Sequence, residues 1–182
     1  MLAAALDEDV GGAATRAAGV IASADFSKLV DALRGRGYTV IGPTVRHGAI
    51  VYAEVTHEHD LPVGWTDHQE PGIYRLQADG AATRFAYAVG PTTWKRYLYP
   101  PVRRLWRAER HGDSFDLIAD SRPVPKYAFL GVRPCDLHAL AILDKIYLAG
   151  LAADPEYAAR RENALIIAVQ CTAPAATCFC AS

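Results

Sequence analysis

The last third of the chain contains a strand–helix–strand pattern, and this pattern most restricts how the chain can fold. Residues 127–132 form a continuous apolar run of strand length, and residues 165–169 form another. Between them, residues 134–148 carry apolar side chains at helical spacing, and residues 155–161 form a second helical stretch behind Asp154. Two buried strands joined by a helical crossover are typical of a parallel βαβ unit.

The first two thirds of the chain show shorter elements. Residues 26–33 have helical spacing. Residues 38–41 and 49–55 predict one hairpin, and residues 73–76 and 84–89 predict a second strand pair. The fold class expected is therefore α/β of the mixed α+β kind. An N-terminal helix and antiparallel hairpins precede the βαβ unit. Further elements expected are a loop at 57–70, a short helix at 92–99 and a strand at 115–119.

The first 22 residues read differently from the rest. Residues 1–22 are rich in Ala and Gly and carry the acids Asp7, Glu8 and Asp9, so we expect a mobile extension there. A secretory signal would have a basic start and an apolar core, and neither is present. We therefore expect a cytoplasmic, reducing location. Residues 23–182 are expected to form a single α/β domain.

Charge and hydropathy exclude two classes of partner. The 19 basic and 20 acidic residues give a formal net charge of −1, which does not favour nucleic-acid binding. No apolar run approaches the roughly 18–20 residues of a membrane span. The stretch from Trp94 to Arg107 mixes aromatic and basic residues. We interpret it as a helix with a basic solvent face, not as a base-stacking surface.

All four cysteines lie in the last quarter of the chain, and the βαβ pattern explains why this matters. Cys135 follows the first strand of the unit, and Cys171 follows the second. Parallel strands end at the same edge of a sheet, which is where open α/β sheets place their sites. Cys178 and Cys180 follow within one short loop. The four sulfur atoms are therefore predicted to converge at this edge.

Four converging thiols suit two kinds of metal. A [4Fe–4S] cluster takes four cysteine ligands, and so does a structural zinc ion. The spacing Cys-x₆-Cys-x-Cys plus one remote cysteine matches neither the zinc knuckle nor the ferredoxin pattern. A third interpretation treats the cysteines as small buried hydrophobic residues. If they are ligands, the dipole of the helix that begins at Cys135 is expected to lower the pKa of that thiol.

Two charged residues flank the first of these cysteines. Arg133 and Asp136 stand on either side of Pro134-Cys135, and both are candidate cofactor-binding residues behind the ligands. The arginine could hold a cluster sulfide, a flavin phosphate or a neighbouring carboxylate, or it could form a salt bridge that shapes the turn. His57 and His59 lie in a polar segment and are interpreted as solvated side chains.

Several short motifs together are similar to those of a known family. They occur in the order Gly37-Tyr-Thr-Val-Ile-Gly-Pro43, Tyr87-Ala-Val-Gly-Pro91, Trp94-Lys95, Tyr99-Pro-Pro101, Phe129-Leu-Gly-Val-Arg-Pro-Cys-Asp136, Asp154-Pro-Glu-Tyr-Ala-Ala-Arg-Arg-Glu162 and Cys171 to Cys180. From about Phe26 to Ser182, this series resembles the β subunit of cytosolic group 3b NiFe hydrogenases (sulfhydrogenases). It also resembles the iron–sulfur electron-transfer subunit of anaerobic sulfite reductase.

The resemblance implies an iron–sulfur electron-transfer subunit of a multi-subunit oxidoreductase. Such a protein relays electrons between two partner subunits, one containing a flavin and the other catalytic, so we expect no turnover from this chain alone. Family members carry a C-terminal dicluster ferredoxin segment, whereas this sequence stops at Ser182, just past Cys180. We therefore expect the front portion of a longer subunit. The alternative is a cofactor-free or zinc-binding docking module of such a complex.

Overall fold

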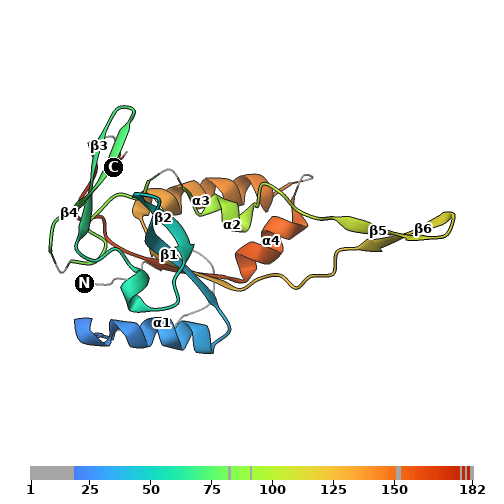
Figure 1. Cartoon of the computed structure of the whole chain (residues 1–182), viewed down its shortest axis with the longest axis horizontal. Coiled ribbons are helices and arrows are strands. Elements are labelled where there is room, and N and C mark those ends of the chain that lie inside the picture. The colour runs from blue at the N-terminus through green and yellow to red at the C-terminus, as the bar shows by residue number, and fades with distance from the viewer. Residues whose placement is uncertain are drawn as a thin grey trace.

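The centre of the structure is a four-stranded mixed sheet with the strand order β2-β1-β7-β8 (Figure 1). The structure is a computed structural model that describes residues 19–81, 83–90, 92–150, 153–176, 178 and 180. β1 (Thr39–Arg46) pairs antiparallel with β2 (Ala49–Glu54) and parallel with β7 (Tyr127–Val132). β7 in turn pairs parallel with β8 (Ala164–Ala168). The predicted mixed α/β class and its parallel βαβ unit are confirmed.

Helices cover both faces of this sheet. α1 (Phe26–Gly35) packs its buried residues on one face, together with the short 3₁₀ turn η1 (Ser23–Asp25) before it. α2 (Lys95–Leu98), α3 (Pro134–Tyr147) and α4 (Pro155–Glu162) pack on the other face. Side chains alternate along each strand as strand geometry requires. Val40 and Leu130 therefore join the α1 side of the core, and Ile41 and Phe129 join the α3 side.

β7 ends in a bulge that depends on glycine. The β7–β8 register shifts between Leu130 and Val132, which leaves Gly131 as the extra residue on β7. Gly131 has φ +89°, a value that side chains disfavour. A Cβ at this position would lie 2.8 Å from the ring carbon Cε1 of Phe85. The bulge therefore lets β7 pass tightly under Phe85 just before its carboxyl end.

The second hairpin differs from the predicted one. β3 (Trp65–Glu70) pairs with β4 (Ile73–Ala78) around the two-residue turn at Pro71-Gly72, where Gly72 has φ +75°. The prediction that 73–76 pairs with 84–89 is wrong, and so is the predicted loop across β3. A ribbon with both faces partly exposed tolerates the polar sequence of β3, which looks like a loop in the sequence. Residues 57–64 do form a loop with the single turn η2 (Glu58–Asp60).

A third hairpin projects from the body of the protein (Figure 1). It consists of β5 (Trp106–His111) and β6 (Ser114–Ala119), so the strand predicted at 115–119 is confirmed. The predicted basic helix between Trp94 and Arg107 is wrong beyond α2. Trp94 is buried in the core, and Trp106 is exposed in a strand. Pro100 and Pro101 follow α2, and proline cannot continue a helix because it lacks an N–H.

The N-terminal extension falls mostly outside this description. Of the predicted extension 1–22, residues 1–18 lie outside the described residues, and residues 19–22 form no helix or strand. In the part of the chain that the structure describes, no helix is long and apolar enough to cross a membrane.

We expect the substitution Gly131→Ala to destabilise the fold more than the matched substitution Gly37→Ala. Both glycines have a positive φ, +89° and +81°, but a Cβ at Gly37 meets nothing within 4 Å. Gly37→Ala should therefore cost only the left-handed backbone penalty of about 1–2 kcal/mol. Gly131→Ala should cost more than this because Phe85 must move. Urea unfolding of both variants measures the difference, and equal losses would contradict the tight passage under Phe85.

Candidate metal centre

The sequence Arg133-Pro-Cys-Asp136 forms the junction between β7 and α3. Arg133 is the residue before the helix, with an extended backbone, and Pro134 takes the first helical position, where its missing N–H costs nothing. Asp136 then lies in the first turn. Its Oδ2 accepts hydrogen bonds from the backbone N–H of Arg133 and from the hydroxyl of Tyr52, each at 3.2 Å. The aspartate therefore faces the core and holds the start of the helix.

Arg133 points to the sulfur atom of Cys171. Its Nη1 donates a hydrogen bond to Sγ at 2.9 Å, and its Nη2 donates to the backbone carbonyl of Phe85 at 3.3 Å. Cys171 follows β8, and the pairing of β8 with β7 continues through the bond from Val169 N–H to the Val132 carbonyl, at 2.8 Å. The parallel strand ends thus bring the first and second cysteine segments together at one edge of the sheet.

Cys135 has a raised thiol pKa, and the predicted lowering by the helix dipole is wrong. Partial burial raises it most, and the negative charge of Asp136 and the proximity of Cys180 raise it further. The backbone N–H of Asp136 and the charge of Arg133 act in the opposite direction but do not outweigh these effects. The helix N-terminus therefore contributes as expected, but an adjacent carboxylate and burial overcome it.

The remaining two cysteines lie in the loop after β8. Cys178 closes a turn with Ala175: its N–H donates to the Ala175 carbonyl at 3.0 Å, and its sulfur accepts from the Ala175 N–H at 3.3 Å. Cys180 is close enough to Cys135 to affect its pKa. Phe179, between the two cysteines, lies outside the described residues. The loop therefore folds back toward α3, as the cysteine spacing predicts.

The four cysteines are all free and exposed, and the structure brings them together only in part. Arg133 contacts Cys171, and Cys180 approaches Cys135. Within the described ranges, no group of three or more His, Cys, Asp or Glu side chains is arranged to hold a metal ion. The donor chemistry nevertheless fits an iron–sulfur cluster, since four accessible thiols lie near a buried guanidinium that a negatively charged group would balance.

Two residues of this region were not anticipated from the sequence. Phe85 is buried with φ +64°, which is unusual for a bulky residue, and its carbonyl accepts from Arg133. Tyr52 stacks on Trp94 with ring centroids 3.7 Å apart. Burial and the charge of Asp136 raise the pKa of Tyr52, so its hydroxyl stays a proton donor to that carboxylate. No sequence pattern signals a left-handed phenylalanine.

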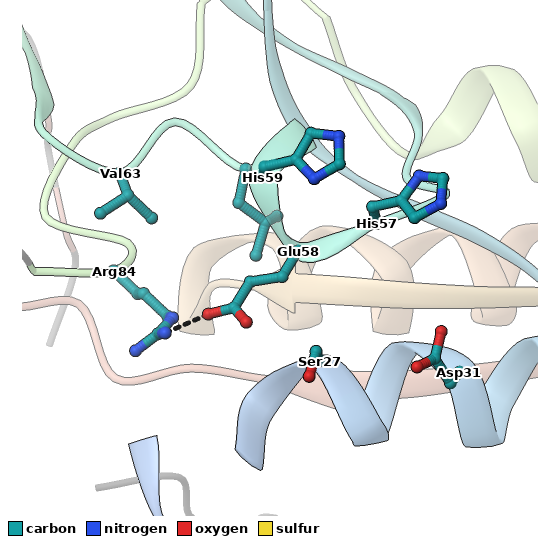
Figure 2. A pocket seen from close by; sticks show the side chains of 8 residues that line it. Ser27, Asp31, His57, Glu58, His59, Val63 and Arg84 are labelled. Atoms are coloured by element: carbon teal, nitrogen blue, oxygen red, sulfur yellow. Dashed lines mark hydrogen bonds and ion pairs between the residues drawn. The ribbon is translucent and has the colours of Figure 1, made fainter. Parts of the chain in front are cut away.

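A separate open pocket of about 610 Å³ lies between α1 and the loop that contains η2 (Figure 2). Its most prominent polar contact is the ion pair of Glu58 with Arg84. His57 and His59 stack at its rim with centroids 5.0 Å apart, exposed as the sequence predicts. None of the four cysteines lines this pocket, so it is distinct from the candidate metal centre.

Comparison with known proteins gives one informative similarity. A segment of 57 residues is 46% identical to subunit beta of sulfhydrogenase 2 from Pyrococcus furiosus. This segment covers 31% of the present chain and 16% of the relative, so the similarity spans a small part of that protein. No family model matches the chain, and no solved structure matches it.

The fold and the candidate centre define a mixed α/β protein with cysteines at the carboxyl edge of a parallel strand pair. The partial match relates this chain to a hydrogenase β subunit. It bears on the hydrogenase side of the expected resemblance. The resemblance to anaerobic sulfite reductase stays a prediction.

We expect Asp136→Asn to increase the reactivity of Cys135 toward iodoacetamide severalfold at about pH 7. The negative charge of Asp136 raises the pKa of this thiol, so its removal lowers the pKa and increases the thiolate fraction. The measurement uses a chain in which Cys171, Cys178 and Cys180 are replaced by Ser. Asp113→Asn at the exposed hairpin turn is the control and should leave the rate unchanged. An unchanged pH profile in the Asp136 variant would contradict this electrostatic assignment.

Proposed function

We propose that this chain is an iron–sulfur electron-transfer subunit of a hydrogenase-type oxidoreductase. The observation that carries this proposal is the position of the cysteines. Cys135 and Cys171 follow adjacent parallel strands at one sheet edge, and the guanidinium of Arg133 bonds to the second sulfur. The partial similarity to a sulfhydrogenase β subunit supports the same class of protein.

In this proposal the metal ligands are the four cysteines, with Arg133 and Asp136 behind them. Cys135 lies in the first turn of α3, and Cys171, Cys178 and Cys180 lie in the segment after β8. A [4Fe–4S] cluster bound there would pass single electrons between partner cofactors. The chain itself would position the thiols, exclude water from one side of the cluster and supply charge at its edge. The proposed partners are two other subunits, one containing a flavin and the other catalytic.

The proposal is tested by anaerobic reconstitution of the full chain with iron and sulfide. We expect visible absorption and about four iron atoms per chain, since four cysteines hold a [4Fe–4S] cluster. Cys135→Ser, Cys171→Ser, Cys178→Ser and Cys180→Ser should each lower the iron content by at least half. The control Thr172→Ser makes a similarly small change beside a proposed ligand and should leave the content unchanged.

The second candidate is a docking module that binds zinc or no cofactor. The hairpin formed by β5 and β6 favours it, because this arm exposes large apolar side chains on a segment that projects from the body (Figure 1). Trp106, Phe115 and Leu117 are 57%, 64% and 69% exposed. A two-stranded hairpin alone is marginally stable in water, so a partner surface would stabilise it.

Elemental analysis separates the two candidates. Iron and sulfide in equal amounts after reconstitution would support the electron-transfer subunit. Zinc alone, or no metal together with partner binding that survives Cys178→Ser and Cys180→Ser, would favour the docking module.

A further inference from the structure

Arg133 is an unusual residue because its positive charge is buried without a carboxylate. The residue is 7% exposed. Its side chain donates to the sulfur of Cys171 and to a neutral carbonyl of Phe85. Within the described part of the chain, no carboxylate forms an ion pair with it at 4.0 Å or less. Burying a charge is costly unless an opposite charge or strong hydrogen bonds compensate for it.

The nearest acidic residue does not serve as this counter-charge. Asp136 directs Oδ2 to the backbone N–H of Arg133 and to the hydroxyl of Tyr52. The charge of Arg133 is nevertheless felt nearby, since it lowers the pKa values of Tyr87 and Cys135 against the larger effect of burial. The guanidinium thus retains an unbalanced positive charge that is directed at the sulfur side of the sheet edge.

The backbone around Arg133 holds it in this position. Gly131 forms the left-handed bulge at the end of β7, and the ring of Phe85 packs on it. Phe85 itself has φ +64°, which presents its carbonyl to Nη2 of Arg133. Such conformations cost about 1–3 kcal/mol each and persist only where surrounding contacts enforce them. Both of them act on the same guanidinium.

We propose that Arg133 is a positioning residue of the metal centre, whose guanidinium holds the Cys171 sulfur in place and offsets the negative charge of a cysteine-bound iron–sulfur cluster. This inference rests on the proposed function. The planar fork of arginine bonds to the sulfur and the Phe85 carbonyl simultaneously, which the single ammonium of lysine does not reproduce. Because reduction adds negative charge to a cluster, a nearby cation makes the reduced state more stable.

The test is the midpoint reduction potential of the reconstituted full chain, followed by electron paramagnetic resonance. Arg133→Gln keeps hydrogen-bond donors but removes the charge, so its potential should fall. A tenfold change in the reduction equilibrium, about 59 mV for one electron, is the expected size. Arg133→Lys keeps the charge and should retain a potential close to wild type, with a lower iron content because the fork is lost. Arg104→Gln, at the base of the projecting hairpin, is the charge-matched control and should behave as wild type.

The outcomes separate this inference from the proposed function. A wild-type chain that takes up no iron overturns the proposed function, and the inference with it. A wild-type chain with a cluster, combined with an Arg133→Gln variant of unchanged potential, overturns the inference alone, because a merely structural arginine changes stability and not potential. If Arg133→Gln fails to fold, Arg133→Lys decides: a potential far below wild type despite the retained charge overturns the inference.

Discussion

A hydrogen bond between a buried guanidinium and a cysteine sulfur connects the main parts of this structure. Arg133 belongs to the β7–α3 junction, and Cys171 belongs to the segment after β8, so their bond closes the carboxyl edge of the parallel strand pair. The second arm of the guanidinium reaches the carbonyl of Phe85 in the irregular segment between β4 and α2. Three segments that are far apart in the sequence thus meet at one side chain. The bulge at Gly131 is part of this arrangement, because it lets Phe85 approach β7 closely enough to accept the bond.

Asp136 shows how the same short motif serves two different purposes. Its carboxylate binds the backbone N–H of Arg133 and thereby fixes the first turn of α3, in the way that acidic residues stabilise helix starts. The same charge raises the pKa of the neighbouring Cys135 thiol. A metal that binds this thiol must displace its proton, so binding is coupled to pH through this aspartate. Stability of the helix and reactivity of the thiol are therefore opposed in the four-residue stretch 133–136.

The parts of the fold that the sequence predicts are those with strong periodicity. β7, α3, α4 and β8 agree with the expected ranges to within a few residues, because a continuous apolar strand and an amphipathic helix have few alternative structures. The β3–β4 pairing escapes prediction because its polar strand is only partly buried, and only the Pro71-Gly72 turn signals it. At the site, the common edge of the cysteine segments follows from parallel topology alone. The left-handed Phe85 and the direction of the Arg133 side chain depend on tertiary packing, which no local pattern encodes.

The charges at this edge have a definite order in space. Asp136 is bonded to the hydroxyl of Tyr52, and burial against Trp94 keeps that hydroxyl protonated because the tyrosine pKa is raised. The negative charge is therefore held toward the core by neutral donors, while the positive charge of Arg133 is directed toward sulfur. A group bound by the cysteines would experience the guanidinium at close range and the carboxylate behind a shell of donors. Because Coulomb interactions weaken with distance, Arg133 rather than Asp136 would dominate the field at such a group.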